Sequence, residues 1–127
     1  MRRFAVAQAL VVVLACAGCG RSAPAVPRET ETLGPLPTLS AAEAAQLVGL
    51  PWTADPIRPT DQQFLIDVAD VRCYELAGVN LGTTTTNITV SVLGRRVECR
   101  AGKISAAALV RLPEPVGSRR LIHAPTR

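Results

Sequence analysis

The chain has 127 residues, of which 48% are hydrophobic and 19% are charged, a composition typical of a globular protein rather than a disordered or fibrous one. This length accommodates one small domain, which disfavours a large multidomain enzyme and a multi-span membrane protein. The net charge is +4, but the basic residues are scattered and only 3% of residues are aromatic, so the pattern of a nucleic-acid partner is missing.

The first nineteen residues have the three parts of an export signal. Arg2 and Arg3 form a short basic region, and residues 4–15 form an apolar stretch that only Gln8 interrupts. About twelve apolar residues is the length of a signal's hydrophobic region and is too short to span a bilayer, which takes roughly 20. We therefore predict that residues 1–19 are an export signal.

The end of this segment resembles a bacterial lipoprotein signal, in which a small residue precedes a cysteine that is then lipidated. Both Cys19 and Cys16 follow a small residue. Lipidation at Cys19 removes Cys16 and leaves Cys73 and Cys99 as an even pair, whereas lipidation at Cys16 leaves Cys19 unpaired in an oxidising compartment. We favour Cys19, with Cys16 as the alternative. The competing interpretation is an ordinary secretory signal or an uncleaved anchor.

A lipidated cysteine implies a protein anchored at the extracytoplasmic face of the cell membrane, because two or more acyl chains suffice for stable anchoring. Residues 20–38 follow as a Pro-rich segment, and proline disfavours both helices and central strands. We expect residues 20–38 to be a disordered tether and residues 39–125 to be the folded domain.

A short helix is predicted at the start of this domain. Ser40 is an N-cap, and Glu43 occupies the capping-box position three residues later. Gly49 and Pro51 end the pattern. Trp52, the only tryptophan, is expected to cover one end of the core.

From residue 62 the hydrophobic period changes to two, as in Phe64, Ile66 and Val68. The expected strands cover residues 62–73, 75–81, 88–93, 97–100, 106–113 and 119–124, with turns at 94–96 and 101–103. Short strands separated by turn signals favour a mainly β fold, a small antiparallel sandwich or partial barrel with one short N-terminal helix.

Cys73 and Cys99 lie in separate predicted strands, and outside the cytosol such a pair is expected to form a disulfide. Closing a loop of this length restricts the unfolded chain by roughly 3–3.5 kcal/mol. A zinc site needs two further ligands, and the only histidine is His123. We therefore predict no metal and no cofactor.

Residues 60–125 resemble a recurrent pattern in small secreted proteins and lipoproteins of high-GC Gram-positive bacteria, most of which have no assigned function. The shared features are a strand that ends in Cys73, the alternating run 88–92, Cys99, and Pro-Val-Gly-Ser-Arg at 115–119. The chain departs from the pattern at three positions: Thr83 for Glu, Val116 for Leu and His123 for Asp. The resemblance implies a β fold and a disulfide but no particular activity.

An enzyme is the less favoured class. His123 lies close to the C-terminus, and the acidic residues of the strand region are spread as solvent-facing charges: Asp67, Asp70 and Glu75. The sequence contains none of the common nucleophile, zinc-protease or nucleotide motifs. We predict a non-catalytic binding or structural module that contacts another envelope protein.

Two features are candidate contact surfaces for such a module, a sheet edge and the Thr-rich loop 83–86. A small secreted protease inhibitor is the alternative, and it predicts a rigid exposed loop at 113–119. An extracellular enzyme is a further alternative.

Overall fold

The computed structural model describes residues 29–124. The predicted export signal, Cys16 and Cys19, and residues 20–28 of the predicted tether lie outside this range. Along the described chain the elements are β1 Glu29–Pro35, α1 Ala41–Ala44, β2 Val48–Leu50, β3 Thr53–Ala54, β4 Gln63–Val68, β5 Tyr74–Thr83, β6 Asn87–Arg96, β7 Ile104–Arg111 and β8 Arg120–His123.

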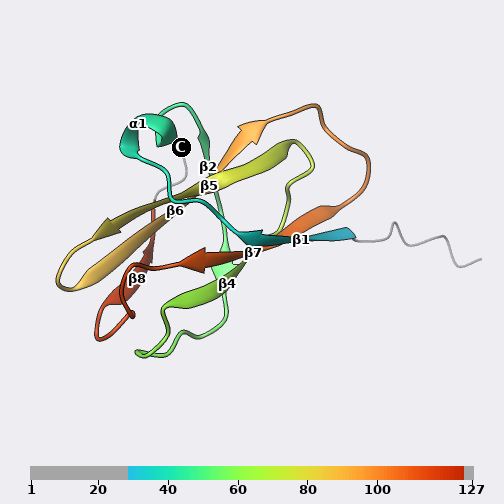
Figure 1. Cartoon of the computed structure of the whole chain (residues 1–127). Coiled ribbons are helices and arrows are strands. Elements are labelled where there is room, and N and C mark those ends of the chain that lie inside the picture. Colours follow the sequence, from blue (N-terminus) through green and yellow to red (C-terminus); the bar gives the residue numbers. More distant parts are fainter. Residues whose placement is uncertain (1–28, 125–127) are drawn as a thin grey trace, which may run out of the picture.

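The strands form two sheets that pack face to face (Figure 1). The first sheet has the order β1-β7-β4-β3, and the second has β6 at its centre. β5 pairs with one side of β6, while β2 and β8 share its other side. The predicted mainly β fold with one short N-terminal helix is confirmed, and its architecture is sandwich-like.

Strand direction differs from the expectation in two places. The pairs β4–β7 and β5–β6 are antiparallel, as predicted. β1 pairs with β7, and β8 pairs with β6, in parallel. These strands reach their partners through long connections instead of hairpins, and such a crossover is what parallel pairing requires. Both sheets are therefore mixed.

The predicted tether is wrong over its second half, because residues 29–35 form β1 at the edge of the first sheet. No proline lies between Pro27 and Pro35, and an edge strand tolerates a proline at its end. The segment that follows also belongs to the fold. The Val79 N–H donates to the Pro37 carbonyl (2.9 Å), and the Leu39 N–H donates to the Val79 carbonyl (2.7 Å). The folded unit thus begins at Glu29.

The turn predicted at 94–96 and the strand predicted at 97–100 are also wrong. β6 continues through Arg96, and the residues after it form a loop. Gly94 lies within β6, and β2 packs closely against it. A Cβ at this position would lie 2.8 Å from Leu50 Cδ1, so the close approach favours glycine. The glycine marks a close approach between strands rather than a turn.

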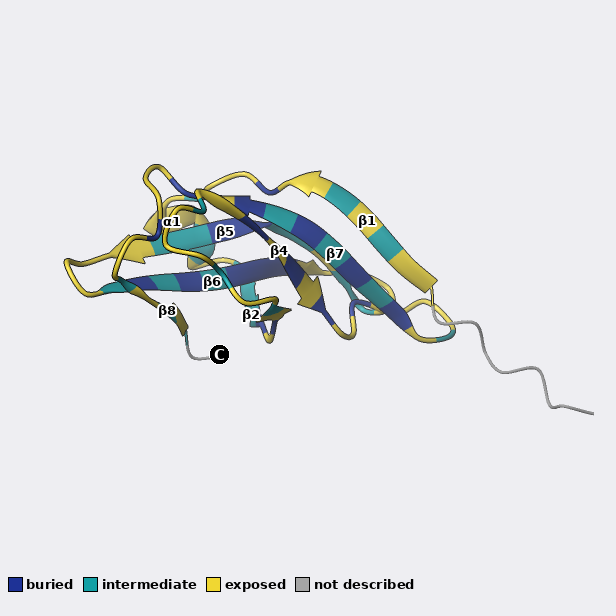
Figure 2. Ribbon diagram, turned by 90° about the horizontal axis from the view of Figure 1, so that it is seen from below, coloured by how far each residue is buried: buried dark blue, intermediate teal, exposed yellow. Residues whose placement is uncertain are grey.

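The predicted strand 62–73 ends at Val68, and along β4 and β7 buried residues alternate with more exposed ones (Figure 2). Val71 still points into the core, and its N–H donates to the Ile104 carbonyl at 2.8 Å. Val71 is thus part of the core although the strand has already ended.

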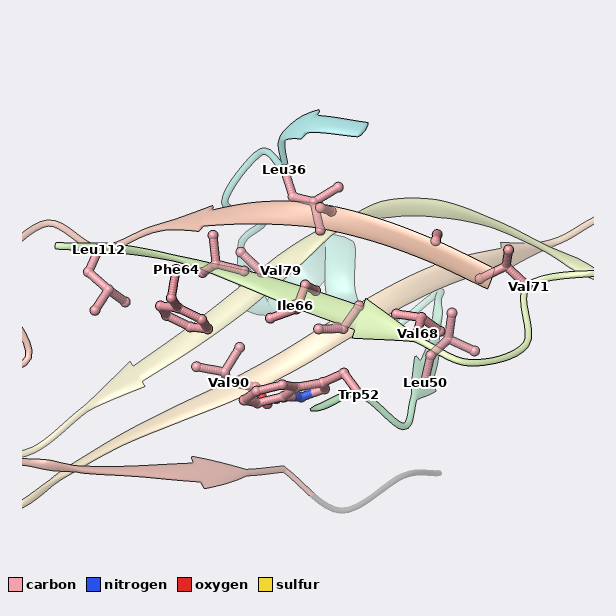
Figure 3. Close-up of a cluster of buried hydrophobic side chains, with 14 of the residues drawn as sticks. Leu36, Leu50, Trp52, Phe64, Ile66, Val68, Val71, Val79, Val90 and Leu112 are labelled. Atoms are coloured by element: carbon pink, nitrogen blue, oxygen red, sulfur yellow. Dashed lines mark hydrogen bonds between the residues drawn. The ribbon is translucent and has the colours of Figure 1, made fainter. Parts of the chain in front are cut away.

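The core lies between the sheets and is almost entirely aliphatic (Figure 3). Its largest fully buried side chains are Ile66, Ile88, Val68, Val71, Val79, Val90, Val92 and Val110. Trp52 is 5% exposed, and its indole N–H donates to the Val90 carbonyl at 3.3 Å. Its polar atom is thus satisfied, as burial of an indole requires.

Candidate functional site

The β5–β6 hairpin ends in a turn that is held by its own hydrogen bonds. The Thr84 N–H donates to the Asn87 carbonyl at 2.8 Å. Thr84 Oγ1 accepts from the N–H groups of Asn87 (2.9 Å) and Thr86 (3.3 Å). A short hydroxyl side chain that bonds to the backbone just after it is a common way to stabilise a turn. Thr83 and Thr85 remain exposed.

Loop 113–119 is attached to the body of the domain at its centre. Val116 is 6% exposed, and its N–H donates to the Asp61 carbonyl at 2.9 Å. The Gly117 N–H donates to the Pro59 carbonyl at 2.8 Å, and Gly117 has a φ of 65°, which favours glycine at this position. A buried side chain and two backbone bonds thus hold the loop in one conformation.

Arg119 stabilises the same loop through hydrogen bonds to carbonyl groups of the loop. Its side chain is only 14% exposed and turns back onto the loop. Nη2 donates to the Pro115 carbonyl (2.6 Å), and Nε donates to the Val116 carbonyl (3.1 Å). Glu114 lies 3.8 Å from the guanidinium. Carbonyl groups of the loop itself thus bind the arginine.

The two loops meet at one end of the sandwich, which we call the loop end (residues 83–87 and 113–119). The Arg120 N–H donates to the Thr86 carbonyl at 2.8 Å and joins them. A shallow cavity of about 590 Å³ is lined by Thr83, Thr84, Thr85, Glu114, Val116, Gly117, Ser118 and Arg119. The surface is rich in hydroxyl groups, so it can form hydrogen bonds with a partner.

The opposite end, which we call the disulfide end, contains residues 70–73 and 97–103 and the point where the chain enters at Glu29. Because β1 and β7 run in parallel, Glu29 lies beside Ile104, whereas β7 leads at its other end into loop 113–119. Figures 1 and 2 show the two ends at opposite extremes of the strands.

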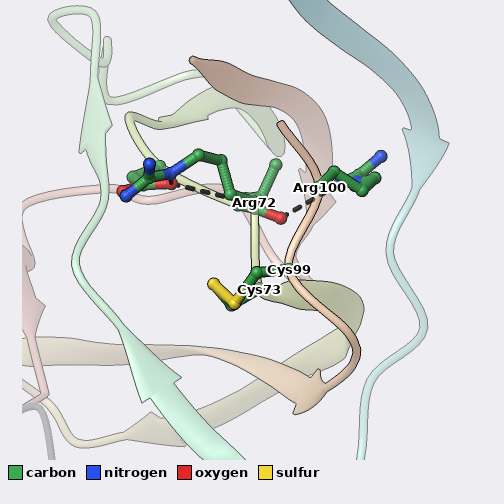
Figure 4. The surroundings of a disulfide bond; sticks show 6 residues. Arg72, Cys73, Cys99 and Arg100 are labelled. Atoms are coloured by element: carbon green, nitrogen blue, oxygen red, sulfur yellow. Dashed lines mark hydrogen bonds and ion pairs between the residues drawn. A yellow bond between two sulfur atoms is a disulfide. The ribbon is translucent and has the colours of Figure 1, made fainter. Parts of the chain in front are cut away.

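The Cys73–Cys99 disulfide, confirmed by the structure, ties this end together (Figure 4). The neighbouring arginines add polar contacts. Arg72 pairs with Asp70 (3.2 Å), and Arg100 pairs with Glu31 and donates to the Val71 carbonyl (3.0 Å). The N–H of Arg72 and then its guanidinium hold the pKa of Asp70 below its usual value.

The other acidic residues considered from the sequence are dispersed over the two sheets. Asp67 lies on β4 in the first sheet, and Glu75 lies on β5 in the second sheet. Within residues 29–124, no three His, Cys, Asp or Glu side chains come close enough to hold a metal ion.

His123 has a role that the sequence did not reveal. Its ring stacks on Trp52 with centroids 3.8 Å apart and an interplanar angle of 13°. The stack places β8 over the indole of Trp52. The two residues are far apart in the sequence, so no local sequence pattern predicts their contact.

Comparison with known proteins gives no match, whether to a protein-family model, to a curated protein or to a solved structure. Within residues 29–124, no helix is both long enough and apolar enough to cross a membrane. The function is therefore inferred from the geometry of the loop end.

Proposed function

We propose that this chain is a lipoprotein anchored through Cys19, and that it displays a non-catalytic β module at the extracytoplasmic face of the cell membrane. Its loop end binds another envelope protein. The observation that supports this best is the bracing of two exposed loops by Thr84, Val116 and Arg119. Loops that are already ordered lose little conformational entropy when they bind, and binding residues often lie on loops that a rigid scaffold positions.

Under this proposal, an anchor at Cys19 holds the module closer to the bilayer than a tether of residues 20–38 would, because β1 begins at Glu29. Only residues 20–28, nine in number, separate Cys19 from Glu29. Nine residues span at most about 30 Å when fully extended. A module anchored in this way works close to the membrane, and its partner is an envelope protein within that reach.

The anchor is tested by the intact mass of the protein extracted from membranes of its native host, with and without reductant. We expect the mass of residues 19–127 plus a lipid adduct, which increases by two hydrogen atoms on reduction. A lipidated product that begins at Cys16 would select the alternative site. A full-length mass without lipid would overturn the anchoring proposal.

The binding surface is tested by capturing partners from envelope extract of the same host with variants of the protein. Thr85→Arg and Ser118→Arg each place a bulky charge on the loop end, at residues whose side chains are exposed. Ala101→Arg places the same charge at the disulfide end and serves as the matched control. We expect the loop-end variants to lose the partner and the control to retain it. The reverse pattern would move the binding surface to the disulfide end.

A secreted protease inhibitor is the second candidate function, because loop 113–119 is exposed and is also held by hydrogen bonds to the body of the domain. Glu114, Pro115 and Ser118 are exposed, while Val116 and Arg119 are held inward. An inhibitor of this geometry presents Glu114 and Pro115 to a protease. Nanomolar inhibition in a panel of secreted proteases, lost in Pro115→Gly, would replace the binding module by this function. Turnover in a hydrolase panel would overturn the non-catalytic assignment.

A further inference from the structure

The outer faces of the two sheets are covered to different extents. On the second sheet, Val90 and Val92 point into the core, so Ser91 and Leu93 lie on the outer face. α1 and Leu47 lie over that face, and Leu93 is buried there. On the first sheet the outward-facing residues of β4 are exposed, and the exposed fraction of Leu65 is 57%.

The outer face of the first sheet has an uncharged centre. Leu65 of β4 lies opposite Leu109 of β7. The residues around this pair are small or apolar: Thr32, Pro35 and Ala107. A solvated sheet face normally carries polar residues, and an exposed leucine within an uncharged strip across three strands departs from that pattern.

Two opposite charges lie on this face, on either side of the leucine pair. In the antiparallel register, Asp67 lies opposite Ala107, and Arg111 lies opposite Gln63. Both charged side chains are exposed, and neither forms an ion pair within residues 29–124. One acid and one base at opposite ends of an apolar strip make the surface complementary to itself.

We propose that this face binds a second copy of the chain through a two-fold contact. The axis crosses the strands near the Leu65–Leu109 pair, so that the sheets pack face to face, about 10 Å apart, with antiparallel strands. In this arrangement Asp67 of each copy approaches Arg111 of the other, and two equivalent ion pairs enclose the leucines. Such a contact is isologous, which is the commonest symmetry of soluble dimers.

The same arrangement is compatible with two copies in one membrane. An axis that crosses the strands leaves the order of strands across the sheet unchanged, so β1 of one copy faces β1 of the other. Both chains then enter along the same side of the dimer, and both loop ends stay uncovered. Four strands about 4.8 Å apart, with at most eight residues each, give a face of roughly 500 Å², which is smaller than the roughly 800 Å² per partner of a standard interface. The contact is therefore weak in dilute solution and is strengthened when both copies share a surface.

The test uses the full-length protein in membranes, with Leu65→Cys and a bismaleimide whose arm spans the expected separation. The native Cys73 and Cys99 are joined to each other and do not react. We expect a cross-linked dimer from Leu65→Cys. Ile122→Cys, at another exposed apolar side chain on β8, is the matched control and gives none. Absence of a dimer from Leu65→Cys, or equal cross-linking from Ile122→Cys, would overturn the proposal.

Charge reversal in the Leu65→Cys background identifies the ion pairs. Asp67→Arg and Arg111→Asp each turn both contacts into like-charge pairs, and we expect each to lower the cross-linked fraction at least about tenfold. The double reversal restores opposite charges and should recover cross-linking. Single reversals without effect, or a double variant that stays monomeric, would contradict this geometry.

The dimer and the loop-end function are tested separately. Thr85→Arg and Ser118→Arg should leave cross-linking unchanged, because the loop end is outside the contact. If the protein proves not to be lipidated, the same cross-linking series is run at high concentration on the purified full chain with Cys16→Ser and Cys19→Ser, so that the introduced cysteine is the only free thiol. Success or failure there bears on the dimer alone.

Discussion

The two ends of the sandwich are closed by different means. At the disulfide end a covalent bond joins Cys73 to Cys99, and the ion pairs around it are largely exposed. At the loop end a buried Val116 and hydrogen bonds from Thr84 and Arg119 hold the chain. Exposed ion pairs contribute little to stability. The disulfide end therefore adds a covalent bond to the burial of Val71, whereas the loop end depends on burial and hydrogen bonding alone.

This difference separates stability from binding. The covalent bond lies near the point where the chain enters, so it holds the scaffold together without restricting the surface at the other end. Substitutions at exposed loop-end residues can then change binding with little change in stability. Three predictions test this separation, and a fourth concerns α1.

The largest expected effect is at the disulfide end. Replacing both cysteines, in Cys73→Ala/Cys99→Ala, should lower the free energy of unfolding by about 3.5 kcal/mol, because the unfolded chain loses a cross-link over 26 residues. Urea unfolding of the variant and of oxidised wild type measures the difference. Reduced wild type is the control and should match the variant. A loss below about 1 kcal/mol would show that this end is held by other contacts.

Val116→Ala tests burial at the loop end. Removing two buried methyl groups should cost about 2 kcal/mol, from lost transfer energy and the cavity that remains. Ile122→Ala, at a side chain that is 38% exposed, is the control and should cost much less. Equal losses in urea unfolding would mean that Val116 does not anchor loop 113–119.

Thr84→Val removes a hydroxyl while keeping the shape of the side chain. Two backbone N–H groups lose their acceptor, and we expect a loss of about 1 kcal/mol. Hydrogen exchange of the Thr86 and Asn87 amides should become faster, and capture of the partner should weaken. Thr85→Val is the matched control, since the Thr85 side chain is exposed. Identical exchange in both variants would contradict the role of Thr84.

The smallest effect is a pH dependence in α1, which lies away from both ends. The backbone N–H of Ser40, and then its hydroxyl, lower the pKa of Glu43 from its ordinary value of 4.5. The folded pKa lies below the unfolded one, so this stabilisation is complete above pH 4.5 and is lost as the pH falls through the folded pKa. The protection factors of the amides in residues 41–44, which are corrected for the intrinsic pH dependence of exchange, should fall on acidification, and Glu43→Gln should abolish this change. An unchanged pH response in Glu43→Gln would assign it to another group.

Local patterns in the sequence predicted the elements that depend on neighbouring residues. The capping box of Ser40 and Glu43 is present as expected, and the alternation of Phe64, Ile66 and Val68 matches the buried face of β4. These features follow from periodicity and side-chain chemistry within a few residues.

The errors occurred where a distant partner determines the conformation. Prolines indicated a tether, yet β7 recruits residues 29–35 as an edge strand. A glycine indicated a turn, yet Gly94 is in a strand because Leu50 packs against it. The stack of His123 on Trp52 joins residues that are far apart in the chain, so no local signal predicts it.

The sequence by itself determined the mainly β character, the short capped helix and the expected pairing of Cys73 with Cys99, because alternation and capping are local patterns and the two cysteines lie in separate predicted strands. Only the tertiary structure decided which strands are neighbours. That choice joins loops 83–87 and 113–119 at one end and places Asp67 and Arg111 on one uncovered face. The physical reason is that strand neighbours are selected by burial of the whole core, which no short stretch of sequence contains.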